Sequence, residues 1–495
     1  MAGKLRKLIA VLIIGVFNLA FARPSYADVT LDDLLKRVEA VEKQNADLQA
    51  QNASLKTEIE AMKASQAAVP ATAAVAAPQA AKPAAPAPII TANFKDGFSI
   101  KSPDNAYKLK LSGFMQSDGR VFTNNKKDSS GGTSTFLIRR ARLYVTGTVA
   151  NDFNFTLVPD FSATSGTVLT YGYADYTKYP MFQIRAGKFV EPFSIENLQS
   201  SMYYNFAELG LPANLYPQRD IGLQISGGVL NDSLKYAVGI FNGEVDHEAY
   251  STENADTNND KDVVGRIWVS PFKNTNLKPV QGLGMGFAFA YGHQDEGTVS
   301  TTAPYNSNNP TYVTPGQLIV FSYNSGVSPN GPRLRTSPQM TYYYKSFGLL
   351  GEYVDSYQDF AKGSGSTLVK DRFDNKAWQL STTYVLTGED ATYNGVTPKN
   401  NFNPSKGSFG AFELAARYGE LNLDHKIFTD GFADANTYIS REHAWGSGLN
   451  WYLNPNVKLV FDFEQTKFRR GSVLAINNGN RKPENVVTSR VQVAF

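Results

Sequence analysis

Hydrophobic and polar residues alternate along the last ten residues of the chain, 486–495. One face carries Val487, Ser489, Val491, Val493 and Phe495, and the other carries Thr488, Arg490, Gln492 and Ala494. A period of two predicts a β-strand, and a strand between lipid and water needs one apolar and one polar side. We therefore predict that this strand, which ends on an aromatic residue, closes a transmembrane β-barrel. A strand of a soluble β protein is the alternative interpretation.

The same alternation recurs throughout the chain from residue 94 onward. Examples are YKLKLSGFMQSDGR at 107–120, FLIRRARLYVTGTV at 136–149, FQIRAGKF at 182–189, GAFELAARYGEL at 410–421 and NVKLVFDFEQ at 456–465. Arg139 breaks the pattern in the second of these, which indicates a bulge or a strand end. Short turns such as 453–456 alternate with long polar loops at 242–262, 292–315 and 387–408, as in outer-membrane barrels. At roughly 25 residues for each strand with its connection, about 400 residues predict about 16 antiparallel strands around a water-filled lumen.

Residues 1–27 have the pattern of a secretory signal peptide. Lys4, Arg6 and Lys7 precede an apolar run at 8–21, and a small-residue cleavage site ends at Ala27. We predict cleavage after Ala27. An uncleaved membrane anchor is the alternative, although the apolar run is short for a spanning helix.

Residues 28–63 show a heptad pattern that predicts an N-terminal α-helical coiled coil. The two seam positions hold Leu31, Val38, Asn45, Asn52 and Ile59, and Leu34, Val41, Leu48, Leu55 and Met62. Spacings of three and four favour a left-handed coiled coil, in which the two asparagines would specify register. A single amphipathic helix lying on its own barrel is the alternative. Residues 64–93 are rich in alanine and proline and predict an extended linker, so the barrel domain is expected over 94–495.

Composition agrees with a barrel and excludes several other classes of protein. The chain has 26 Tyr, 31 Phe and 40 Gly but only 7 Met, which favours strands, tight turns and aromatic girdles over helices. A mean hydropathy of −0.30 is too polar for a helical membrane protein. The absence of cysteine excludes disulfides and thiolate metal sites, and a net charge of +3 gives no indication of nucleic-acid binding.

Seven segments in consistent order resemble the phosphate-selective porin O and P family of Gram-negative outer membranes. They are SGFMQSDGRVF, FLIRRARLYVTGTVANDFNF, IRAGKFVEPFSIENLQSS, YVLTGED, GAFELAARYGELNL, GLNWYLNPNVKLVFDFEQ and SRVQVAF. The resemblance implies a 16-stranded barrel, a homotrimer, inward-folded loops, a narrow eyelet lined by arginine and lysine, and passive anion transport. It assigns the eyelet's basic residues to Arg139, Arg140 and Arg185, and its tandem serines to Ser200 and Ser201.

One position departs from the family pattern. Phosphate-specific members place a lysine after the glutamate of the constriction loop, whereas here Asn197 follows Glu196. The missing lysine weakens the assignment of phosphate as the solute. Glu191 and Glu196 would also repel an anion if they face the lumen.

Arginine suits an anion pathway because its planar fork offers several donors and stays charged. Arg120, Arg140, Arg142 and Arg185 share the parity expected for the lumen face. The candidate pore-lining and anion-binding residues are Arg120, Arg139, Arg140, Arg142, Arg185, Ser200 and Ser201. The alternative is that the arginines only brace the wall by pairing with carboxylates such as Asp118, Asp175, Glu413 and Glu464.

The sequence therefore predicts an outer-membrane porin for passive diffusion of small hydrophilic solutes, with anions favoured. The alternative function is structural, with the periplasmic coiled coil and linker tethering the outer membrane to the cell wall. The expected partners are small anions or other hydrophilic solutes, outer-membrane lipid and cell-wall contacts of the coil, without nucleic acid. The four histidines are scattered and form no Ser–His–acid arrangement, so we predict no enzyme, catalytic residue, metal site or cofactor.

Overall fold

The computed structural model describes residues 50, 53–54, 57, 87–93, 97–123, 132–162, 167–243, 259–295, 309–363, 365–470 and 482–495. The chain divides into two units, Met1–Pro86 and Ala87–Phe495. The predicted signal peptide and most of the predicted coiled coil and linker lie outside the described residues. The four described positions of the first unit, at 50, 53, 54 and 57, are helical but do not show a coiled coil. None of the helices in the described parts is long and apolar enough to cross a membrane.

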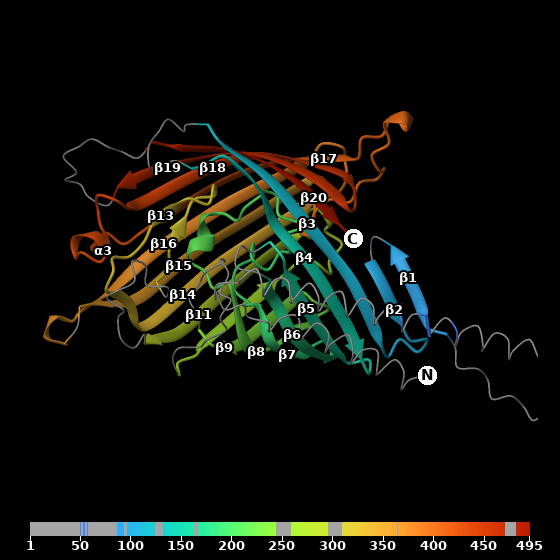
Figure 1. Cartoon of the computed structure of the whole chain (residues 1–495), viewed down its shortest axis with the longest axis horizontal. Coiled ribbons are helices and arrows are strands. Elements are labelled where there is room, and N and C mark those ends of the chain that lie inside the picture. Colours follow the sequence, from blue (N-terminus) through green and yellow to red (C-terminus); the bar gives the residue numbers. More distant parts are fainter. Residues whose placement is uncertain are drawn as a thin grey trace, which may run out of the picture. The chain divides into compact units, whose positions relative to one another are not determined.

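The second unit is organised around one antiparallel sheet, in which 18 strands are described (Figure 1). Sixteen of these strands close into a barrel, because β20 pairs with β3. The barrel strands are β3 (Lys108–Phe122), β4 (Thr135–Val149), β5 (Phe153–Asp160), β6 (Val168–Tyr179), β7 (Phe182–Val190), β8 (Arg219–Val229), β9 (Leu234–Phe241), β10 (Asp262–Val269), β11 (Leu283–Asp295), β14 (Val327–Tyr344), β15 (Phe347–Lys362), β16 (Val369–Val385), β17 (Ala411–Asn422), β18 (Ile439–Asn454), β19 (Val457–Arg470) and β20 (Glu484–Ala494). The predicted closed barrel of 16 strands is confirmed.

Two further strands precede the barrel in the chain. β1 (Ile89–Asn93) and β2 (Gly97–Lys101) form a hairpin, and β2 pairs with the first residues of β3. β1 occupies the end of the range expected to be linker. Its sequence, IITAN, begins with three β-branched residues, which favour an extended strand.

The closing strand β20 shows how the alternation divides lipid from lumen. Val491 and Val493 point outward and are 47% and 42% exposed, whereas Arg490 and Gln492 point inward and are buried. Arg490 lies directly opposite Asp118 on β3, so the polar faces of the two strands meet inside the barrel. The predicted faces of this strand are therefore confirmed.

Aromatic residues mark two levels on the outer surface of the barrel. Near the turns, Phe412 and Trp451 stack with ring centroids 5.3 Å apart. Six residues further along the same two strands, Tyr418 packs on Trp378 of β16, and Trp445 packs on Phe463 of β19. Amphipathic rings at two levels with aliphatic residues between them are typical of the aromatic girdles of a transmembrane barrel.

Most connections at one end of the barrel are short turns, although 270–282 and 386–410 at this end are long. β14 and β15 are joined by residues 345–346, and β18 and β19 by residues 455–456. The connection at 386–410 also lies at this end, because it joins β16 to β17. The sequence predicted a long loop here of the same kind as 242–262, but strand order places it among the short turns.

Candidate pore constriction

The connection between β7 and β8, residues 191–218, folds inward instead of leaving the barrel. We call it the constriction loop. It contains the short helix η1 (Leu211–Asn214), and its residues Phe193, Leu211 and Tyr216 are almost fully buried. Burial of these large apolar side chains favours the inward path, since an outward loop would leave them in water.

Polar side chains of the barrel wall hold the middle of the constriction loop through its backbone. Six loop carbonyls each accept a hydrogen bond from a lumen-facing side chain. The pairs are Gln116 to Ser201 (3.0 Å), Gln492 to Met202 (3.2 Å), Lys458 to Tyr204 (2.9 Å), Asn450 to Asn205 (3.0 Å), Arg490 to Ala207 (2.7 Å) and Arg417 to Glu208 (3.0 Å). A buried loop must satisfy its carbonyl groups, and here β3 and β17 to β20 supply the donors.

The first part of the constriction loop is fixed to the opposite part of the wall by Glu352 on β15. Ser194 Oγ donates to one carboxylate oxygen of Glu352 at 2.9 Å, and the Ile195 amide donates to the other at 3.1 Å. Gln339 on β14 donates to the carbonyl of Phe193. The loop therefore spans the lumen between two groups of strands.

Glu208 of the constriction loop binds four arginines of the wall. Its carboxylate lies 2.6 Å from Arg120 NH2, 2.6 Å from Arg139 Nε, 3.6 Å from Arg490 NH2 and 3.7 Å from Arg140 NH2. We call these four residues the clamp arginines. Burial on its own would raise the pKa of Glu208, but the guanidinium groups of Arg139, Arg140 and Arg120 lower it below its usual value. The carboxylate therefore stays charged.

A β-bulge explains why Arg139 reaches the lumen. The register of β3 and β4 shifts between Gln116 and Ser117, whose partners are Arg140 and Ile138, so Arg139 is the extra residue. Its Nε and NH2 both donate to Glu208. The bulge expected from the broken alternation is confirmed, and it lets two consecutive arginines contact one carboxylate.

The other predicted residues of β4 and the constriction loop lie beside this cluster. Arg142 pairs with Asp160 at 2.8 Å, and its NH1 lies 3.4 Å from Ser201 Oγ. Ser200 Oγ accepts a long hydrogen bond, 3.5 Å, from the Met202 amide. The structure therefore brings Arg120, Arg139, Arg140, Arg142, Ser200 and Ser201 into one region.

Arg185 lies apart from this region, on β7. It forms two hydrogen bonds with Asp175 of β6, at 2.7 and 3.1 Å. Its guanidinium carbon lies 4.1 Å from the centre of the Tyr173 ring, and its side chain is 32% exposed. Of the carboxylates considered as bracing partners, Asp118 lies 3.8 Å from Arg120, and Asp175 binds Arg185.

Glu196 and Asn197 are two loop positions that depart from the basic residues expected for the pore. Glu196 accepts hydrogen bonds from Gln379 (2.7 Å) and the Gly210 amide (3.0 Å), and lies 3.4 Å from Arg417. Asn197 is 2% exposed, and its side-chain amide has no hydrogen-bond partner among the described residues. Asn197 therefore does not present its side chain to an open passage.

Several lumen residues were not identified as functional from the sequence. Arg417, Lys458 and Arg490 hold the loop, and their inward-facing positions in alternating strands were the signal that could have identified them.

Arg266 on β10 was also not identified from the sequence. Its Nε donates to Gln339 at 2.9 Å, and its guanidinium lies 4.7 Å from the Trp268 ring. Among the described residues, no carboxylate lies within 4.0 Å of it, and its NH2 has no hydrogen-bond partner.

Arg219, at the start of β8, resembles Arg185 and Arg266 in its aromatic contact. Its guanidinium lies 5.0 Å from the centre of the Tyr171 ring, and its NH2 donates to the Tyr171 hydroxyl at 3.2 Å. We call Arg185, Arg219 and Arg266 the stacked arginines. All three are only partly buried, whereas Arg140 and Arg490 are 1% and 2% exposed.

The connection at 386–410 contacts the constriction loop from the turn end. Tyr393 donates its hydroxyl proton to the carbonyl of Ile195, and Gln199 donates to the carbonyl of Tyr393. The segment YVLTGED begins this connection. Within it, Gly388 has a φ of +87°, and Glu389 accepts a hydrogen bond from the Lys399 amide at 3.1 Å. These contacts fold the turn back toward the lumen.

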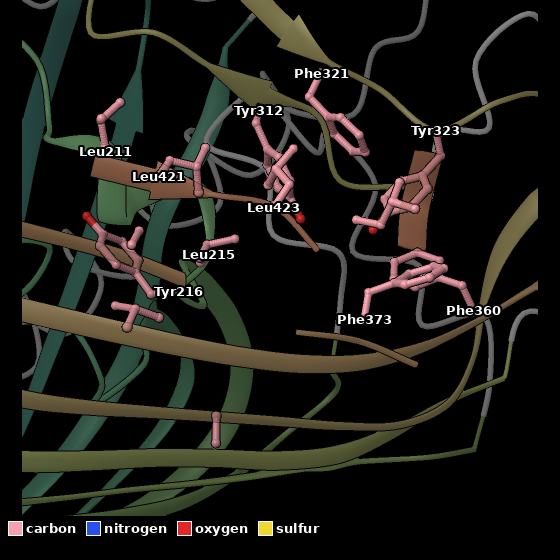
Figure 2. Packing of buried hydrophobic residues seen from close by; sticks show 14 of the residues in the cluster. Leu211, Leu215, Tyr216, Tyr312, Phe321, Tyr323, Phe360, Phe373, Leu421 and Leu423 are labelled. Carbon is pink, nitrogen blue, oxygen red and sulfur yellow. The ribbon is translucent and has the colours of Figure 1, made fainter. Parts of the chain in front are cut away.

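A second segment reaches across the loop end of the barrel. β12 (Tyr312–Val313) and β13 (Ile319–Phe321) form a small hairpin between β11 and β14. Thr314 donates to Glu484 of β20 at 2.9 Å, and Asn214 of the constriction loop donates to the carbonyl of Val313 at 3.0 Å. Figure 2 shows the aromatic packing beside it, where Tyr323 stacks on Phe360 at 4.3 Å.

The chain is similar to a family of porins, to a curated porin and to several solved outer-membrane proteins. The model of a family described as phosphate-selective porin O and P matches residues 109–495. Porin O of Pseudomonas aeruginosa is 24% identical over 426 residues, which cover 81% of this chain and 91% of that protein. Among solved structures, the outer membrane channel DcaP of Acinetobacter baumannii is 11% identical, with 80% of this chain and 99% of that chain covered and a TM-score of 0.47. The loop L8 deletion mutant of OmpT from Vibrio cholerae is 9% identical, with coverages of 79% and 100% and a TM-score of 0.47.

Proposed function

Because this chain belongs to the phosphate-selective porin O and P family, and is therefore an outer-membrane porin, we propose that it favours anions among the small hydrophilic solutes that diffuse through it. The observation that carries the proposal is the gathering of guanidinium groups around the constriction loop. Four of these guanidinium groups surround the single carboxylate of Glu208. A narrow passage beside fixed cations attracts anions and disfavours cations.

In our proposal, the candidate residues have two different roles, which are shaping the passage and contacting the anion. The four arginines of this region shape the passage by holding the loop and contribute positive potential; they are Arg120, Arg139, Arg140 and Arg142. Ser200 and Ser201 belong to the held part of the loop. Arg185, together with Arg219 and Arg266, contacts the permeating anion directly. Their partial exposure supports this role, because a guanidinium that rests on a ring still presents part of its edge to the passage, although Arg185 also donates to Asp175 and Arg219 to Tyr171.

We do not propose strict selectivity for phosphate. Phosphate-specific members of the family place a lysine where this chain has Asn197, and Asn197 is buried. Glu196 adds a carboxylate at the same turn of the loop, although Arg417 and Gln379 bind it. A channel that prefers anions in general fits these residues better than a phosphate-specific one.

Assembly and the N-terminal region are part of the same proposal. We propose a homotrimer, with the periplasmic coiled coil of residues 28–63 joined to the barrel by the linker. Family membership indicates a channel rather than an enzyme. The alternative function, a tether between the outer membrane and the cell wall, receives no support from the family or from the described residues.

The proposal is tested by reversal potentials of the purified protein in planar bilayers under a potassium chloride gradient. An anion-favouring channel reverses near the chloride equilibrium potential. Replacing chloride by phosphate then measures whether phosphate permeates or blocks. A reversal potential near the potassium equilibrium value, or the absence of conductance, would reject the proposal.

A further inference from the structure

Four basic side chains form a patch on the outer surface of β18 and β19, the neighbouring strands labelled in Figure 1. Arg441 lies directly opposite Arg469, and His443 lies directly opposite Lys467. Their neighbours in sequence, Glu442 and Thr466, are buried inside the barrel, so the four basic residues point outward. We call these four residues the outer basic patch.

Direct pairing of like charges is unfavourable in an antiparallel sheet. Among the described residues, Glu420 of β17 is the carboxylate next to the patch: it binds Arg441 at 2.6 Å and lies directly opposite His443. Lys467 and Arg469 are exposed, and their side chains form no ion pair with any described residue. The sequence from 471 to 481, GSVLAINNGNR, follows β19 and contains no acidic residue that could neutralise them. Lys467 and Arg469 are therefore accessible to an external anion.

The level of the outer basic patch on the barrel indicates where this anion lies. Directly below it, Trp445 donates to Gln465 at 3.2 Å, and Gln465 donates to Asn485 at 2.8 Å. This polar row ends the apolar band, in which Phe461 and Val487 are exposed. The patch begins one step beyond the row, at the end of the barrel with the long loops, which faces the outside in outer-membrane barrels.

We propose that the outer basic patch binds a phosphorylated lipid of the outer leaflet. Phosphate oxygens accept charge-assisted hydrogen bonds from arginine and lysine, and the acyl chains of the same lipid would lie along the apolar band below. Trp445 lies at the boundary between the two parts of the lipid. The patch faces away from the lumen, so this binding is separate from solute passage.

The test uses the full-length protein in a zwitterionic detergent, titrated with diphosphorylated lipid A, monophosphorylated lipid A or phosphatidylcholine. Bound lipid is counted by native mass spectrometry, and affinity is measured by quenching of tryptophan fluorescence. We expect the diphosphorylated lipid to bind most tightly. Each neutralised cation at a membrane surface weakens binding about fivefold, so the double variant K467Q/R469Q should lose about 25-fold.

Two control variants keep this experiment decisive. Lys467→Arg preserves the charge and should bind like the natural protein. Arg372→Gln makes the same change of charge on the outer face of β16, but Arg372 is already paired with Asp359, so its effect should stay below about twofold. Unchanged affinity of K467Q/R469Q, equal loss in R372Q, or tight binding of phosphatidylcholine would overturn the proposal. A change of oligomeric state with unchanged lipid affinity would assign the patch to contacts between copies instead.

Discussion

The clamp arginines and the stacked arginines use the same side chain in different ways. The clamp arginines, on β3, β4 and β20, lie within 3.7 Å of one loop carboxylate, and Arg140 and Arg490 are almost inaccessible to solvent. Arg490 also forms a pair of 2.7 Å hydrogen bonds with Asp118 of the wall. The stacked arginines, on β7, β8 and β10, rest on aromatic rings and remain partly exposed. The number of arginines in a lumen is therefore a poor measure of anion binding, because their partners decide whether the charge fixes structure or meets solute.

The largest effect is expected from Glu208→Gln, which acts on the clamp side of this comparison. The substitution leaves four buried guanidinium groups with one counter-ion fewer, and breaking a buried pair destabilises by about 3–5 kcal/mol. The constriction loop should detach from the wall. Single-channel recordings should show a higher and noisier conductance, and the thermal unfolding midpoint should fall.

Glu420→Gln is the matched control for this prediction. Glu420 also pairs with an arginine, Arg441, but the pair lies on the outer surface. Exposed pairs contribute about 1 kcal/mol or less, so conductance should stay unchanged. An E208Q channel with the conductance and stability of the natural protein would show that Glu208 does not hold the loop.

The next largest effect is expected from Arg266→Gln, on the stacked side. Arg266 has no carboxylate within 4.0 Å among the described residues, so its removal takes away a full positive charge from the lumen wall. One unit charge a few ångströms from an ion in water is worth about 1 kcal/mol, which corresponds to about a fivefold lower permeability ratio of chloride to potassium at low salt. Arg266→Lys should keep most of the preference, and a reduced preference in both variants would point to lost packing instead.

Trp268→Leu should have a smaller effect of the same sign. The indole ring lies 4.7 Å from the Arg266 guanidinium and orients it. Loss of a cation–π contact of about 0.5–1 kcal/mol should make the side chain more mobile without removing its charge. We expect less than about a twofold fall in the permeability ratio, measured in the same gradient. A loss as large as that of R266Q would mean that orientation, and not charge, sets the preference.

The smallest effect is expected from mild acid. The pKa of Glu208 is lowered in the folded protein, so its stabilising contribution is complete above its unfolded pKa and is lost only as the pH falls through the lowered value. Conductance should therefore not rise through release of the loop between neutral pH and about pH 5. An E208Q-like conductance appearing in this interval would contradict the charged clamp.

The sequence predicted the barrel well because period-two alternation reports the two faces of each strand directly. The inward parity of Arg120, Arg140 and Arg142 was readable for the same reason. Their common partner was not, because Glu208 belongs to a loop far away in sequence, and only the folded loop brings it to the clamp. Likewise, whether Arg266 has a carboxylate partner depends on which residues lie near β10 in the folded barrel. The position of 386–410 depends on strand order, which a polar loop composition does not reveal.

The most direct test of the division between the two groups is a comparison of reversal potentials in one potassium chloride gradient. The double variant R185Q/R266Q loses two stacked arginines, of which Arg185 is 32% exposed although it pairs with Asp175, and R142Q loses an arginine that pairs with Asp160 beside the clamp and is 8% exposed. We predict that R185Q/R266Q reverses close to zero, without preference for either ion, whereas R142Q stays near the value of the natural protein. A natural-like value for R185Q/R266Q together with a lost preference in R142Q would contradict the account.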